Sequence, residues 1–87
     1  MKIQDDIIHT LNTSGVVTMD NVFIGAIVRR GPDWKWDDQD GLRKGIVVSI
    51  ERFNKRWVQV SWGDTLSTYG YSYRVGAENS YDLIFAE

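Results

Sequence analysis

The sequence predicts an all-β domain, a small barrel of about five short antiparallel strands. Three observations predict this fold class. Short apolar segments alternate with polar residues at period two, Gly, Pro and Asn residues separate these segments, and no long segment of helical period interrupts them. With 87 residues, the chain has the size of a single domain with one modest core.

Residues 1–20 are expected to form a flank that precedes the barrel. Four apolar residues of this flank fall on one helical face: Ile3, Ile7, Ile8 and Leu11. The segment 12–15, Asn-Thr-Ser-Gly, is typical of a helix end. A helix of about ten residues is marginal alone in water, so this one must pack on something. It covers one end of the barrel, is a partly ordered flank of an excised domain, or binds a partner.

Residues 21–87 are expected to form the barrel domain. The predicted strands are, in order, Phe23–Arg29, Gly45–Glu51, Trp57–Trp62, Tyr69–Val75 and Tyr81–Phe85. In the second predicted strand, one face carries Ile46, Val48 and Ile50, and the other carries Val47, Ser49 and Glu51. In the third, one face carries Val58, Val60 and Trp62. Because Trp62 shares its face with two valines, we expect it to be a core residue. Short strands and tight turns indicate a bent barrel of the SH3-like kind, whose closure leaves no free edge. Residues 33–43 are expected to form an irregular, ordered loop.

The charge distribution argues against nucleic acid as a partner. The first 20 residues hold one basic and three acidic groups, and residues 21–87 hold nine of each, which together give the net charge of −2. A neutral body lacks the positive surplus that attracts a phosphate backbone. The apolar runs are too short to cross a membrane, and no secretory signal pattern is visible. Without cysteine, a domain this small is expected in the cytoplasm or nucleus.

Three segments follow one another in the order that a known family has. They are residues 30–41 (RGPDWKWDDQDG), 57–62 (WVQVSW) and 72–83 (SYRVGAENSYDL). They resemble the RGxDWxWxDQDG, WxxVxW and SYRxGxEGxxDL motifs of the Mib/HERC domain of Mind bomb, HERC and other HECT-type ubiquitin ligases. The resemblance covers about residues 24–85. Asn79 stands where the family has glycine, and Asn tolerates the left-handed backbone that such a turn needs.

The resemblance implies a non-catalytic module that recognises a protein or peptide, as substrate or partner, for ubiquitination by a parent E3 ubiquitin ligase. In Mind bomb ligases, such domains bind the cytoplasmic tails of Notch ligands. A segment without cysteine cannot carry ubiquitin as a thioester or hold the zinc of a RING. We therefore expect no catalytic centre, no cofactor and no small-molecule substrate in these residues.

Two sets of residues are singled out as the candidate site. Exposed Trp and Tyr side chains provide large contact area at low entropic cost, and with nearby polar groups they form the predicted partner-binding set: Trp36, Asp38, Gln39, Tyr69, Tyr71 and Tyr73. A second set is expected to hold the motif together: Asp33, Trp34, Asp40, Gly41, Trp62, Arg74 and Gly76.

Several of these residues have a second possible role. The loop carboxylates either accept backbone N–H groups and pair with Arg30, Lys35 or Arg74, or form an acidic rim that faces a ligand. Arg74 is expected to pair with Asp33 or Asp40, the alternative being contact with a ligand. A calcium loop fails, because Trp36 and Val47 would stand at its first and last ligand positions. No metal is expected.

Two other functions remain open. SH3-like barrels of the Tudor type bind methylated lysine in an aromatic cage, and the surplus of Trp and Tyr beside Asp is compatible with such a methyl-lysine reader in a chromatin-associated protein. A cage needs three or four rings that converge on one point with an acid at the rim, whereas a peptide groove spreads its rings along a line. The third possibility is a domain that only packs within its own parent protein.

Overall fold

The computed structural model describes residues 15–51, 53, 56–63 and 70–86. Within these ranges lie five strands, β1 (Ile27–Arg30), β2 (Gly45–Ile50), β3 (Trp57–Trp62), β4 (Tyr71–Arg74) and β5 (Leu83–Phe85), and one short 3-10 helix, η1 (Ala77–Asn79). The all-β class and the five antiparallel strands are confirmed. The helix predicted in the first 14 residues lies outside the described ranges.

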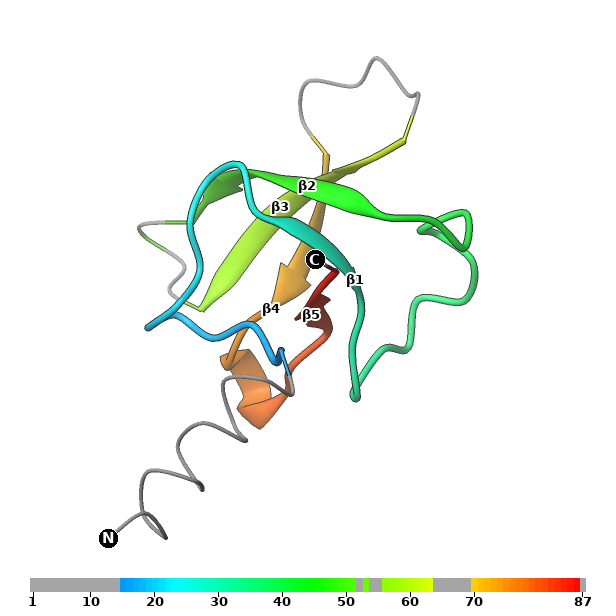
Figure 1. Ribbon diagram of the computed structural model, residues 1–87. Helices are drawn as coiled ribbons and strands as arrows, with labels where there is room; N and C mark the ends of the chain where they lie inside the picture. Colours follow the sequence, from blue (N-terminus) through cyan, green and yellow to red (C-terminus); the bar gives the residue numbers. More distant parts are fainter. Residues whose placement is uncertain (1–14, 52, 54–55, 64–69, 87) are drawn as a thin grey trace, which may run out of the picture.

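The five strands form one antiparallel sheet with the order β4-β3-β2-β1-β5. The sheet bends so that β5 lies beside β1, as Figure 1 shows. The sheet does not close, because β4 and β5 are its two edges and share no ladder. A single isolated bridge, Val75–Tyr81, joins the residues just outside these edges. The fully closed barrel that we expected is therefore an open, bent sheet.

The first strand begins later than predicted. The segment Phe23–Ala26 forms a turn, in which the Ala26 N–H donates to the Phe23 carbonyl at 3.1 Å and Gly25 has a φ of 98°. The Gly25 N–H still donates to the Val47 carbonyl at 2.8 Å, but the left-handed backbone of Gly25 interrupts the extended conformation. The strand therefore starts at Ile27, and Phe23 is left with an exposed ring that stacks on Phe85.

The second strand departs from simple alternation. A bulge between Val47 and Ser49 shifts its register against β3. A bulge adds a residue on one strand, so side chains beyond it change face. Val47 is fully buried and Ile50 packs against the core, whereas Ile46 is partly exposed. Ile46 and Ile50, which were expected to share one face, therefore differ in their contact with the core.

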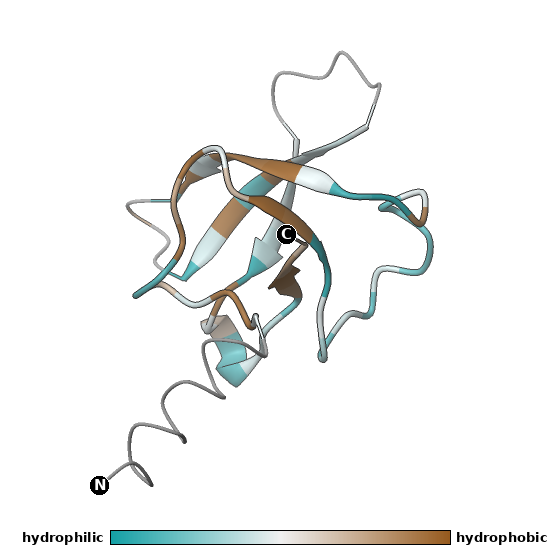
Figure 2. Cartoon of the chain, viewed as in Figure 1, coloured by the Kyte–Doolittle hydropathy of each residue, from teal (hydrophilic) through white to brown (hydrophobic). Residues whose placement is uncertain are grey.

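The core of the described residues is mostly β-branched. It contains Trp62 and the buried residues Val17, Ala26, Val28, Val47, Val58, Val60, Tyr73, Val75 and Leu83. Figure 2 shows hydrophobic stretches along β2 and β5. In β3, the alternation of half-buried and buried residues matches the predicted face, and Trp62 is a core residue as expected.

Candidate recognition site

The loop between β1 and β2 is fixed to the chain that precedes β5. The Gly31 N–H donates to the Asp82 carbonyl at 2.6 Å, and the Asp33 N–H donates to the Tyr81 carbonyl at 3.0 Å. The Asp33 carboxylate accepts the Tyr81 N–H in return, at 2.7 Å. Tight turns inside the loop add bonds such as Gly41 N–H to the Asp38 carbonyl, at 2.8 Å. The loop is irregular and ordered, as predicted.

Four rings meet where this loop crosses the sheet, and we call them the aromatic cluster: Trp34, Trp36, Trp62 and Tyr73. Trp34 stacks on Tyr73 with ring centroids 5.1 Å apart and meets Trp62 edge-on at 5.8 Å. Trp36 meets Tyr73 edge-on at 6.0 Å. Trp34 and Trp36 are both half-buried and pack against the core. Each of them therefore has one part in the core and another part at the surface.

Tyr73 stands at the centre of the cluster and is fully buried. Its hydroxyl accepts the Trp62 indole N–H at 2.8 Å and donates to the side-chain oxygen of Gln39. Burial raises the pKa of Tyr73 to about 12. The prediction of Tyr73 as a partner contact does not fit this position, because Trp34 and Trp36 cover it. Tyr71, two residues earlier on the same strand, is 50% exposed.

Arg74 forms the best-connected ion pair of the site, with Asp82. Its Nε donates to Asp82 Oδ2 at 2.9 Å and its Nη2 to Oδ1 at 2.7 Å. The same carboxylate accepts the Arg74 backbone N–H at 2.8 Å and the Trp36 indole N–H at 3.1 Å. Hydrogen bonding to Asp82 raises the pKa of Arg74.

The carboxylate predicted for Arg74 was wrong. Asp33 contributes only its backbone carbonyl, at 3.1 Å from Arg74 Nη2, and Asp40 pairs elsewhere. Asp82 is the functional residue that sequence reasoning missed. A signal was present, because Arg74 and Asp82 belong to the same motif, and the turn between them reverses the chain.

Asp40 pairs with Arg30 instead. Arg30 Nε donates to Asp40 Oδ2 at 2.8 Å and Arg30 Nη2 to Oδ1 at 2.6 Å. Asp40 is 1% exposed, and its Oδ1 also accepts the Leu42 N–H at 3.0 Å. The hydrogen bonds from Arg30 lower the pKa of the Asp40 carboxyl. The expectation that loop carboxylates bind backbone N–H groups and Arg30 is confirmed for Asp40.

The turn residues of both motifs take left-handed backbone. Gly41 has a φ of 62° and Gly76 a φ of 129°, which supports their predicted structural role, because side chains other than glycine are strained there. Asn79 replaces the glycine of the family motif with a φ of 60°. The prediction that Asn would tolerate this backbone is confirmed.

Three of the remaining predicted contacts are next to Tyr73, and the fourth, Asp38, precedes Gln39 in the loop. Trp36 packs on its ring, Gln39 binds its hydroxyl, and Tyr71 precedes it on β4. Asp38 and Gln39 are exposed. We call Trp36, Asp38, Gln39 and Tyr71 the recognition face. Tyr69 lies outside the described residues.

The recognition face offers two aromatic surfaces, a carboxylate and an amide. Within the described ranges, no three His, Asp or Glu side chains lie close enough together to hold a metal ion.

The aromatic cluster is packed too closely for a lysine cage. A cage holds a cation between rings that stand apart, whereas here Trp34 and Tyr73 stack at 5.1 Å. The indole faces already carry the protein's own cations: Arg30 lies 5.2 Å from the Trp34 centroid and Lys35 5.1 Å from that of Trp36. The four rings converge rather than spread along a line, and it is their close packing and the cations already on the indoles that argue against a lysine cage here.

Comparisons with known proteins agree with the motifs. The family model described as Mib_herc2 matches residues 25–87. E3 ubiquitin-protein ligase HERC2 of Homo sapiens is 49% identical over 65 residues, which is 74% of this chain and 1% of the relative. E3 ubiquitin-protein ligase Ufd4 of Drosophila melanogaster is 40% identical over 63 residues, 72% of this chain and 2% of the relative. E3 ubiquitin-protein ligase MIB2 of Gallus gallus is 37% identical over 73 residues, 77% of this chain and 7% of the relative.

The chain therefore spans only a few per cent of the length of these ligases. Its own described residues contain no helix that is long and apolar enough to cross a bilayer.

Proposed function

Because this chain belongs to the Mib_herc2 domain family, we propose that it is a non-catalytic module with which an E3 ubiquitin ligase recognises a protein or peptide, as substrate or partner, for ubiquitination. The named relatives are E3 ubiquitin-protein ligases. A thioester cysteine and the thiolates of a RING are both excluded by a composition without cysteine. The ligase chemistry would then lie elsewhere in the parent protein, in the cytoplasm or nucleus.

The recognition face is the part of the module that we assign to the partner. The observation that carries this assignment is the way Tyr73 supports its neighbours. Trp36 and Gln39 are held by this buried ring and its hydroxyl, and Tyr71 extends the face along β4 with half of its surface exposed. Side chains held in one position lose little entropy on binding. Exposed or half-exposed Trp and Tyr are also the residues that most often dominate binding energy.

Binding at this face should depend weakly on salt. The body of the chain carries equal numbers of acidic and basic residues, so long-range attraction contributes little. Affinity must come from buried aromatic area and a few hydrogen bonds, which ionic strength screens only slightly. This expectation separates the proposal from a phosphate-binding protein, whose affinity falls steeply with salt.

The experiment starts from selection of peptides on the 87-residue chain, with a random library displayed on phage. Affinities of the selected peptides are then measured for the unmodified chain and for Tyr71→Ala. We expect Tyr71→Ala to weaken binding by about tenfold, which is 1.4 kcal/mol. Phe53→Ala is the matched control, because Phe53 is a fully exposed ring in the turn between β2 and β3, and its affinity should be unchanged.

Each other outcome has a meaning. A failure to select any peptide would favour a domain that only packs within its parent protein. Equal binding by Tyr71→Ala and the unmodified chain would remove the recognition face from the proposal. Trimethylated lysine peptides serve as a separate probe, and a strong preference for them over unmodified lysine peptides would favour the methyl-lysine alternative.

A further inference from the structure

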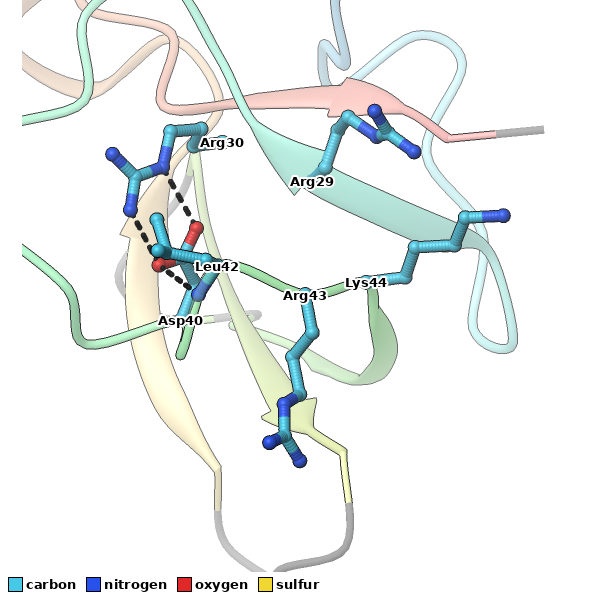
Figure 3. A pocket seen from close by; sticks show the side chains of 6 residues that line it. All are labelled: Arg29, Arg30, Asp40, Leu42, Arg43 and Lys44. Atoms are coloured by element: carbon cyan, nitrogen blue, oxygen red, sulfur yellow. Dashed lines mark hydrogen bonds and ion pairs between the residues drawn. The ribbon is translucent and has the colours of Figure 1, made fainter.

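A second surface, separate from the recognition face, lies where the loop returns to β2. An open pocket of about 500 Å³ is lined there by Arg29, Arg30, Asp40, Leu42, Arg43 and Lys44 (Figure 3). Four of these six side chains are cations. The one carboxylate, Asp40, is buried and already bound by Arg30. The pocket is therefore locally positive, although the body of the chain is neutral.

Two of the cations are placed side by side. In the β1–β2 ladder, Ile27 pairs with Ile46 and Val28 with Gly45, so Arg29 and Lys44 are next in register, opposite one another. Figure 3 shows both side chains extending to the same side, away from the Arg30–Asp40 pair. Like charges across neighbouring strands destabilise a sheet. Among the ion pairs of the described residues, none neutralises Arg29 or Lys44.

Leu42 lines the same pocket with an exposed side chain and an unfavourable backbone conformation. Its side chain is 77% exposed and its φ is 57°, in the left-handed region. A branched residue is strained there, and exposure gives it no compensating burial. The Asp40 carboxylate holds it in place through the Leu42 N–H. Strain combined with an exposed apolar side chain is characteristic of contact sites.

Further apolar surface continues along the sheet. Ile27 and Ile46 form a cross-strand pair in which each is 39% exposed. They line an adjoining open pocket of about 310 Å³ together with Lys44 and Ser61. Cations and exposed aliphatic side chains thus alternate over β1, β2 and the end of the loop.

We propose that this surface, defined by Ile27, Arg29, Leu42, Lys44 and Ile46, binds an acidic peptide segment that carries an apolar side chain among its carboxylates. Charge complementarity selects the acidic partner, since carboxylates would relieve the repulsion between Arg29 and Lys44. The aliphatic residues select a peptide over a nucleic acid, because a phosphate backbone offers them nothing to bury. The recognition face shares no residue with this surface, so the proposal stands independently of the proposed function.

The test uses the 87-residue chain and a short fluorescein-labelled peptide of Glu and Asp with leucine at its centre. Fluorescence anisotropy gives the affinity. We expect binding that weakens as salt rises and falls by about tenfold or more in the double variant Arg29→Glu/Lys44→Glu. The matched control is Arg29→Lys/Lys44→Arg, which keeps both charges and should keep the affinity. Phe53→Ala, a change at a fully exposed ring that belongs to neither surface, should bind the peptide as well as the unmodified chain does.

Leu42→Gly tests the apolar part of the surface. Glycine removes the left-handed strain together with the side chain, so the melting temperature should rise or stay the same. Affinity for the leucine-containing peptide should fall, while affinity for the same acidic peptide with serine in place of leucine should not change. A large loss of stability in Leu42→Gly would show that Leu42 serves the fold, and would overturn its assignment as a contact.

Three further results would overturn the proposal as a whole. The first is that the double charge-reversal variant binds the acidic peptide as tightly as the unmodified chain does. The second is that the unmodified chain binds a peptide with Gln and Asn in place of Glu and Asp equally well. The third is that the amide NMR signals that shift on titration with the peptide belong to residues distant from Ile27, Leu42 and Lys44. Vesicles of phosphatidylserine and a single-stranded RNA are run in parallel. Binding of either in preference to the peptide would assign the surface to that partner and contradict the proposal.

Discussion

Arg74 and Asp82 are buried together and joined by two parallel hydrogen bonds, with Nε–Oδ2 at 2.9 Å and Nη2–Oδ1 at 2.7 Å. They lie on either side of η1, so their pairing fixes the turn that returns the chain from β4 to β5. Trp36 donates its indole N–H to the same carboxylate. One ion pair thus connects the edge strand, the turn and the loop that carries the recognition face.

The first prediction concerns this pair. Asp82→Asn keeps the size of the side chain but leaves the buried guanidinium with only the exposed carboxylate of Glu78, 3.3 Å away, as counter-charge, so the free energy of unfolding should fall by about 3–5 kcal/mol. Chemical denaturation measures the change. The double variant Arg74→Met/Asp82→Asn should recover part of the loss, because it no longer buries an unpaired charge. A loss in the double variant equal to the sum of the two single losses would show that the two residues are not coupled.

The second prediction concerns the core. Trp62→Ala removes the ring that packs edge-on against Trp34 and Tyr73, so it should cost about 3–5 kcal/mol and unfold the domain or nearly unfold it. Thermal denaturation followed by circular dichroism measures the effect. Trp57→Ala is the matched control, because Trp57 is only half-buried, and should cost less. If the melting temperature of Trp62→Ala were within a few degrees of that of the unmodified chain, the assignment of Trp62 to the core would be contradicted.

The third prediction concerns pH. The pKa of Tyr73 is about 12 in the folded chain and about 10 when unfolded. The folded state therefore disfavours the ionised phenol. The resulting stability is fully present below pH 10 and is lost as the pH rises toward 12.

Denaturation at a series of pH values tests it. At neutral pH, Tyr73→Phe should be less stable than the unmodified chain by about 0.5–1.5 kcal/mol, because the hydrogen bonds of the hydroxyl are lost. Between pH 10 and pH 12, Tyr73→Phe should lose less stability than the unmodified chain does. Phe53→Leu is the control, because Phe53 is fully exposed and carries no ionisable group, and its curve should follow that of the unmodified chain. Parallel curves for Tyr73→Phe and the unmodified chain would show that folding does not raise the pKa of Tyr73, which would contradict the prediction.

The strands were predictable where short-range pattern decides them. The segment Trp57–Trp62 alternates without interruption, and its strand bounds and buried face matched the prediction. The pattern failed at Phe23–Ala26 and at the bulge after Val47 because backbone conformation, not hydrophobicity, decides both positions. A single residue in the left-handed region or one extra residue in a strand leaves little trace in apolar periodicity.

The sequence predicted which residues belong to the candidate site better than it predicted which of them contact one another. The motifs placed Arg74 near carboxylates, but Asp33, Asp40 and Asp82 are chemically equivalent in a sequence. The partner is decided by the chain reversal at η1, which brings Asp82 to Arg74. Tyr73 was assigned to the surface by its spacing from Tyr71. Its burial follows from Trp34 and Trp36, and the sequence does not specify that their loop folds back over β4.

The central claim is that the recognition face binds the partner of a ubiquitin ligase. Its most direct measurement is the calorimetric affinity of a peptide, selected on the unmodified chain, for Trp36→Ala. Trp36 donates to Asp82, so this variant will lose some stability, and its amide NMR spectrum must first show a folded chain at the working temperature. We predict a loss of about 2 kcal/mol or more of binding free energy, with little dependence on salt. A folded Trp36→Ala chain that binds the peptide as tightly as the parent would contradict the claim.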